Sequence, residues 1–121
     1  MKKQREAEAP IREAIKRGDY PLTINPEKQA RHMEATASPG RSVITISQDE
    51  LQEIINAKAG DGEIQLVKNT FEWKQQEIID EGKEIGYTVN KNSDIISTTR
   101  FKIHYSNTGV HAVPNSKRWK Q

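Results

Sequence analysis

Alternation of apolar and polar residues is the strongest pattern in the chain, and it is strictest from Thr99 to Ser106. Phe101, Ile103 and Tyr105 fall on one side of a strand with this spacing, which predicts that they face the core. We therefore predict a strand over residues 98–106. Its other side is entirely polar and carries Arg100, Lys102, His104 and Ser106.

Further strands are predicted where β-branched residues lie between turn-forming residues. They cover residues 63–67, 77–80, 84–89 and 110–113, with a short extended run at 42–46. Hairpin turns are expected at 81–82, 90–93 and 107–109, where Asn, Ser and Gly gather.

The clearest helix is predicted to begin after Ser47 and end before Gly60. Ser47 and Glu50 have the spacing of a capping box, in which each side chain accepts a free amide of the first turn. Gly60 supplies a left-handed stop. The apolar stripe between them contains Leu51, Ile54 and Ile55.

A second helix is predicted over residues 26–34, because Asn25 is a good N-cap and Pro26 suits the first helical position. Lys28 and His32 are four residues apart on it and would share one face. A charged helical lead-in opens near Pro10. Helices that precede an antiparallel sheet predict an α+β domain, with the helices on one face of a four- to five-stranded sheet.

The amino-acid composition excludes several classes of function for this chain. The chain has 121 residues, enough for one domain, and only 33% are apolar, so the core must be thin. It has no cysteine, which excludes a disulfide, a thiolate metal site and a thiol nucleophile. No apolar run is long enough to span a bilayer and the first residues lack the pattern of a signal peptide, so we expect a soluble, monomeric domain without membrane contact.

The net charge is only +2, but residues 99–121 contain five basic side chains and no acid. An anionic partner at this end and a merely solvated basic tail are both consistent with that cluster. The basic residues are Arg100, Lys102, Lys117, Arg118 and Lys120.

The polar row of the 98–106 strand contains groups that bind phosphate and move protons, and His104 is the member that titrates near neutrality. The alternative is an ordinary solvent-facing strand.

His111 faces His104 if the hairpin loop has an even residue count, and faces the position of Tyr105 if a glycine bulge intervenes. His32 is a third candidate, with Lys28 beside it. A zinc site built from the three histidines is less favoured than proton transfer, because their spacing matches no compact ligand motif.

Trp73 offers an aromatic surface on which a base can stack, or it packs in the core. The sequence has no phosphate-binding glycine loop, no serine-hydrolase elbow and no zinc-protease helix motif.

Several segments together resemble the polymorphic toxin type 50 domain. They are residues 25–32, 40–42, 45–47, 73–74, 82–86 and 102–114. The resemblance covers residues 22–114, which leaves 1–21 as a charged lead-in or linker and 115–121 as a basic tail. Such domains are commonly found at the C-terminus of phage minor head morphogenesis proteins. The resemblance implies a ribonuclease related to barnase, EndoU and the tRNA-cleaving colicins.

The resemblance also implies a site. The matching positions are Lys28, His32, Lys102, His104, Ser106 and His111. We expect a metal-independent, cofactor-free endoribonuclease toxin, in which His104, His32 and His111 move protons and Lys102 stabilises charge. Substrate contacts are assigned to Lys28, Arg100, Ser106, Arg41 and Trp73.

The expected partners are RNA, with tRNA as one candidate, and a cognate immunity protein. Such a toxin would act in the bacterial cytoplasm. The main alternative is a non-enzymatic phage head morphogenesis module, associated with the virion and with phage head proteins. A third interpretation is an RNA-binding domain without catalysis.

Overall fold

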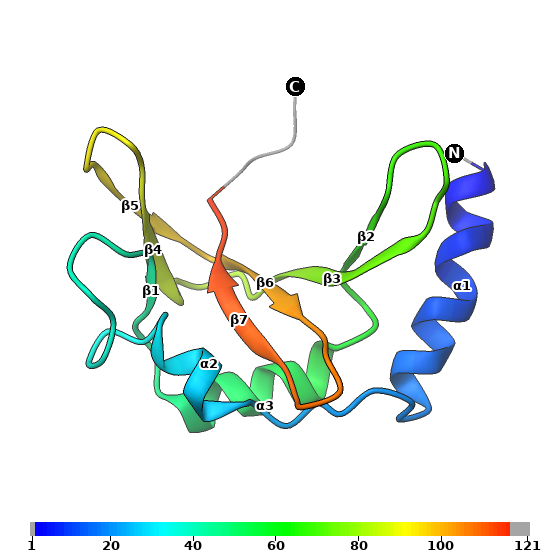
Figure 1. The fold of residues 1–121 in the computed structure, drawn as a ribbon, viewed down its shortest axis with the longest axis horizontal. Coiled ribbons are helices and arrows are strands. Elements are labelled where there is room, and N and C mark those ends of the chain that lie inside the picture. The colour runs from blue at the N-terminus through cyan, green and yellow to red at the C-terminus, as the bar shows by residue number, and fades with distance from the viewer. Residues whose placement is uncertain (1, 117–121) are drawn as a thin grey trace.

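The strands form two antiparallel sheets, as a computed structural model describing residues 2–116 shows (Figure 1). The four-stranded sheet has the order β2-β3-β6-β7 and the three-stranded sheet the order β1-β4-β5. The α+β class is therefore confirmed. The elements are α1 (Lys2–Lys16), α2 (Pro26–Ala30), β1 (Val43–Ile44), α3 (Gln48–Lys58), β2 (Glu63–Leu66), β3 (Trp73–Asp80), β4 (Gly86–Val89), β5 (Ile95–Thr98), β6 (Arg100–His104) and β7 (His111–Pro114).

The division into two sheets occurs at Thr99, between β5 and β6. The Thr98 hydroxyl accepts the Arg100 amide at 3.1 Å and donates to the Asn115 carbonyl at 2.8 Å. The chain turns at these bonds, and β5 pairs with β4 while β6 pairs with β3 and β7. The single strand predicted over 98–106 is wrong at this point.

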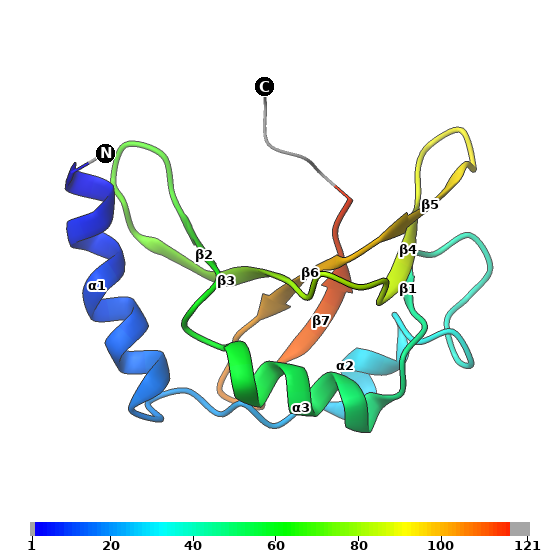
Figure 2. The same cartoon turned by 180° about the vertical axis from the view of Figure 1, so that it is seen from behind.

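The core lies between α3 and the two sheets (Figure 2). Leu51 and Ile55 of α3 are fully buried, as are Phe101 and Ile103 of β6. The predicted core face of that strand is thus confirmed. Its polar face is the opposite one. The β2–β3 and β4–β5 hairpins rise on either side of β6 (Figures 1 and 2).

The caps of α3 were predicted correctly in part. The Ser47 hydroxyl accepts the Glu50 amide at 3.0 Å, and Gly60 has a left-handed φ of +93°. The Glu50 carboxylate, however, forms an ion pair with Lys83 at 2.9 Å.

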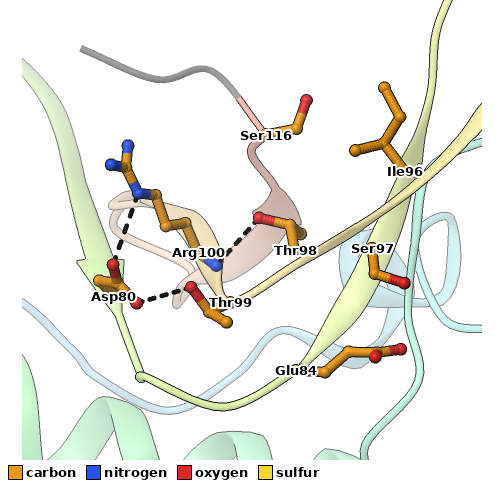
Figure 3. A pocket seen from close by; sticks show the side chains of 8 residues that line it. All are labelled: Asp80, Glu84, Ile96, Ser97, Thr98, Thr99, Arg100 and Ser116. Carbon is orange, nitrogen blue, oxygen red and sulfur yellow. Dashed lines mark hydrogen bonds and ion pairs between the residues drawn. The ribbon is translucent and has the colours of Figure 1, made fainter.

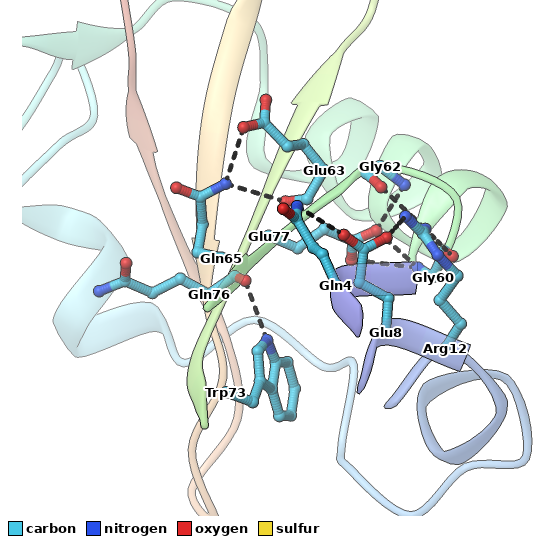
Figure 4. A network of polar contacts seen from close by, with 10 residues as sticks. All are labelled: Gln4, Glu8, Arg12, Gly60, Gly62, Glu63, Gln65, Trp73, Gln76 and Glu77. Carbon is cyan, nitrogen blue, oxygen red and sulfur yellow. Dashed lines mark hydrogen bonds and ion pairs between the residues drawn. The ribbon is translucent and has the colours of Figure 1, made fainter. Parts of the chain in front are cut away.

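Helix α1 begins well before Pro10, which lies exposed within it. Ile15 is only 1% exposed and joins the core. Arg12 donates to the carbonyls of Gly60 and Gly62 at 2.7 and 2.8 Å (Figure 4). The predicted lead-in therefore packs, as helix α1, against the rest of the described domain.

A buried carboxylate joins that region to the sheet. Glu77 of β3 is 0% exposed and accepts the amides of Gly60 and Gly62 (Figure 4). It also accepts the Tyr105 hydroxyl at 2.6 Å. Burial and the neighbouring carboxylate raise the pKa of Tyr105, so its hydroxyl remains a donor.

Helix α2 begins as predicted, because the Asn25 side chain accepts the amides of Glu27 and Lys28. It ends at Ala30, not at Glu34 as predicted. The chain then turns to meet β1: the Ile44 amide donates to the His32 carbonyl at 2.6 Å. His32 thus lies in a turn, because pairing with β1 overrides the local helical preference.

No helix within residues 2–116 has the length and apolar character needed to cross a membrane. The predicted basic tail at Lys117, Arg118 and Lys120 falls outside the described residues.

Candidate active site

His104 and His111 form a cross-strand pair on β6 and β7. Their ring centroids are 4.7 Å apart and the ring planes differ by only 8°. The turn between them closes with the Gly109 amide donating to the Ser106 carbonyl at 3.2 Å. Of the two registers considered, the facing one is present, and the one that sets His111 opposite Tyr105 is wrong.

Gly109 is needed for this turn for two reasons. Its φ of +115° is strained for other residues, and a β-carbon there would lie 2.5 Å from the Thr23 carbonyl oxygen. The close approach lets Val110 form hydrogen bonds with Thr23 and Asn25, which fixes the start of β7.

His32 completes a stack of three imidazoles. Its ring lies 6.3 Å from that of His111, with planes 9° apart, so His111 contacts both of the others. Its Nδ1 is 3.3 Å from the Ser42 carbonyl oxygen. An imidazole from the α2 turn and two from the closing hairpin therefore meet on one face.

Gln29 holds α2 against β7 beside this stack. It is fully buried, its amide group donates to the Ala112 carbonyl at 2.9 Å, and its carbonyl accepts the Ala112 amide at 2.7 Å. Because β7 is the last strand of its sheet, Gln29 satisfies backbone groups that otherwise have no strand partner.

Two lysines flank the stack. Lys28 Nζ lies 3.5 Å from Ser106 Oγ and 3.3 Å from Thr108 Oγ1, at the β6–β7 turn. Lys102 shares the face of β6 with His104, and its charge contributes to lowering the pKa of that imidazole.

Burial lowers the pKa of all three imidazoles, and neighbouring positive charges lower it further. The effect is largest at His111, whose pKa falls from 6.5 to about 4 through burial and then through His104, His32, Lys28 and Arg31. The free site therefore holds neutral imidazoles at pH 7. A bound anion would favour their protonation.

A depression of about 450 Å³ opens beside Lys102 and His104. Thr88 of β4 forms one wall, and Val113 and Pro114 of β7 lie in its lining. The candidate site is thus an imidazole stack that lies between this depression and the β6–β7 turn, which Lys28 contacts.

The family model for bacterial toxin 50 matches residues 24–114, more than half of the chain. The chain belongs to the bacterial toxin 50 family. The matched segment includes all three histidines and both lysines of the site. No curated protein sequence matches the chain.

Other predicted site residues of the toxin domain are not part of the stack. Arg100 contacts Asp80 at 3.5 Å in a second depression of about 320 Å³, where Thr99 also donates to Asp80 (Figure 3). Arg41 lines a small hollow with Arg31, and both charges lower the pKa of His32.

Trp73 of the toxin domain is partly buried and packs against the core, as the packing interpretation expects. Its ring centroid lies 5.0 Å from that of Tyr20 and 5.2 Å from that of Tyr105. Its indole N–H donates to the Gln76 carbonyl at 3.0 Å (Figure 4).

The rings of the stack are parallel and do not converge on one point. Among residues 2–116, no group of three or more His, Asp or Glu side chains is placed to hold a metal ion. The arrangement is suited to proton transfer beside an anion.

Sequence reasoning did not identify Gln29, Arg31, Gln76 or Thr108 as part of this region. Gln76 Nε2 lies 3.5 Å from His104 Nδ1 across the β3–β6 pair. A strand beginning at Trp73 would have shown this pairing, but the predicted strand began at Glu77. Gln29 gives no local signal, because a glutamine in a short polar helix usually faces solvent.

Proposed function

We propose that this toxin domain is a metal-independent endoribonuclease that cleaves RNA through the 2′-hydroxyl beside the broken phosphodiester. The observation that carries the proposal is the stack of His32, His111 and His104 between Lys28 and Lys102. These side chains supply a base, an acid and charge stabilisation, which are the three requirements of the reaction.

In the proposed reaction, a neutral imidazole accepts the proton of the 2′-hydroxyl as that oxygen attacks phosphorus. The bond from phosphorus to the 5′-oxygen breaks, and an imidazolium donates its proton to the leaving oxygen. The products are a 2′,3′-cyclic phosphate and a 5′-hydroxyl end. Lys28 and Lys102 stabilise the negative charge that develops on the phosphoryl oxygens.

The crowding of the imidazoles favours the required mixture of protonation states. A bound phosphodiester raises the pKa of the adjacent rings, so one of them takes up a proton. Repulsion between neighbouring rings then disfavours a second proton, because interacting groups titrate as a unit. One imidazolium beside one neutral imidazole is the acid and base pair that the reaction needs.

The test is cleavage of end-labelled RNA by purified protein in the presence of a chelator. We expect cyclic phosphate ends, no cleavage of an all-deoxy strand, and a loss of about 10²- to 10⁴-fold in His104→Ala and in His111→Ala. Full activity in both variants would overturn the mechanism, and loss of wild-type cleavage on chelation would overturn its independence from metal. RNA binding without cleavage would favour the non-catalytic interpretation.

A toxin domain implies a cognate immunity protein. We propose that this partner covers the histidine face with acidic side chains, since Lys28, Arg31 and Lys102 surround that face. Co-purification with phage heads, without RNA cleavage, would instead support the head morphogenesis alternative.

A further inference from the structure

The depression beside His104 has the composition of a site for a flat, partly apolar group. Val113 and Pro114 give it apolar surface, while Thr88 and Ser116 bring hydroxyl groups. Its volume of about 450 Å³ lies within the range of small-molecule sites. A nucleobase has this combination of an apolar face and a polar edge.

The position of the depression relates it to the proposed chemistry. Lys102 and His104 form part of its lining, so an occupant lies directly beside the imidazole stack. Ser116 also lines the second depression, which contains Arg100 (Figure 3). A bound nucleotide would therefore have Lys102 near one phosphate and Arg100 along the path of the next.

We infer that this depression binds the base of one nucleotide flanking the cleaved phosphodiester, with its face against Val113 and its edge toward Thr88. The inference rests on the proposed ribonuclease function and adds a source of base selectivity to it. Thr88 belongs to the three-stranded sheet, and Lys102 and Val113 belong to the four-stranded sheet, so the subsite lies where the two sheets meet.

Val113 offers a direct test, because it lies on the outer face of β7 opposite Lys102 and is only partly buried. Val113→Phe would fill the depression without entering the core. Val113→Thr keeps nearly the same shape and serves as the matched control. Circular dichroism and the amide NMR spectrum establish that each variant is folded.

The first experiment compares RNA with substrates in which the base on the 5′ or the 3′ side of the cleaved bond is absent. Removing one of these two bases should lower wild-type kcat/KM by roughly 5- to 150-fold, the range for loss of one stacked base. Val113→Phe should lower cleavage of intact RNA by a similar factor and have little further effect on the sensitive abasic substrate. The inference would be overturned if the effects of Val113→Phe and of base removal multiplied independently. It would also be overturned if wild-type protein cleaved intact RNA and both abasic substrates equally. Either result would leave the ribonuclease proposal standing.

The second experiment measures binding without reaction. Amide NMR spectra are followed during titration with 2′-deoxydinucleotides carrying each of the four bases, which lack the attacking hydroxyl. Shifts should include Thr88, Val113 and Ser116, should differ between bases, and should persist in Val113→Thr but not in Val113→Phe. Thr88→Val should change the order of preference among bases. If these shifts occur but RNA is not cut, the catalytic proposal fails; if RNA is cut without them, the base subsite fails.

Discussion

Gln29 forms two hydrogen bonds with the backbone of Ala112, one to its carbonyl at 2.9 Å and one from its amide at 2.7 Å. Ala112 follows His111 directly, and Gln29 lies between Lys28 and His32 in the sequence. One buried side chain thus determines how the α2 segment meets β7.

We predict that Gln29→Met lowers the free energy of unfolding by about 1–3 kcal/mol, because it leaves two buried backbone groups unsatisfied. Cleavage per folded molecule should also fall, and kcat more than KM, because His32 loses its position relative to His111. Urea unfolding and cleavage kinetics measure the two effects. Gln52→Met is the matched control, since Gln52 bonds the backbone of Leu22 and Ile24 in the same manner. If Gln52→Met reduced kcat as strongly, Gln29 would have only a structural role.

Stability should fall on the acidic side of neutrality because of His111. Its pKa is about 4 in the folded protein and 6.5 in an unfolded chain, so the unfolded state takes up the proton first. This group has no effect on stability above about pH 6.5, and destabilises the fold progressively as the pH falls toward 4. Urea unfolding across this window should show a smaller loss in His111→Gln than in the wild type. Parallel curves for the two proteins would contradict the assigned pKa.

Nucleotide binding should be accompanied by proton uptake. The free site holds neutral imidazoles, and an incoming phosphodiester raises their pKa. The affinity for an uncleavable 2′-deoxy oligonucleotide should therefore increase as the pH falls from 7.5 to 5.5. Calorimetry in buffers with different ionisation enthalpies measures the number of protons taken up, and a value of zero would remove the proposed origin of the acid.

The two lysines should differ in which imidazole they influence. Lys28→Ala and Lys102→Ala should each lower kcat on the order of 10²-fold through lost stabilisation of developing charge. NMR titration should show a raised pKa at His111 in the first variant and at His104 in the second, because each lysine lowers the pKa of that ring. Lys91→Ala, in the exposed β4–β5 turn, is the control and should change neither quantity. If each variant changed the pKa of both imidazoles equally, the placement of Lys28 near His111 and of Lys102 near His104 would be contradicted.

Glu77 should be essential for stability and should have no role in RNA cleavage. Glu77→Leu leaves the amides of Gly60 and Gly62 and the Tyr105 hydroxyl without their acceptor, so we predict a loss of about 3 kcal/mol or more. Glu77→Gln retains an acceptor oxygen and should cost less. Urea unfolding distinguishes the two, and equal losses would show that shape, not hydrogen bonding, is what this position requires.

Features that depend on residues close together in the sequence could be predicted from it. The Asn25 and Ser47 caps, the Gly60 stop and the buried face of β6 follow from local spacing, and all are present. The polar row that includes Lys102 and His104 follows from the same alternation.

Features that depend on distant contacts were not predictable. The end of α2 is set by the bridge between Met33 and Ile44, and the hairpin register by the approach of Gly109 to Thr23. The meeting of His32 with His111 depends on Gln29 and Ala112, which are far apart in the sequence. Local patterns suggested each imidazole separately, but only tertiary structure brings them together.

In the proposed mechanism, the pairing of His104 with His111 makes the length of the 105–110 connection a determinant of activity. Side chains alternate between the faces of a strand, so inserting or deleting one residue there would turn the second imidazole toward the interior. We therefore expect that a single codon gained or lost in this short stretch would abolish the proposed activity while much of the scaffold persisted.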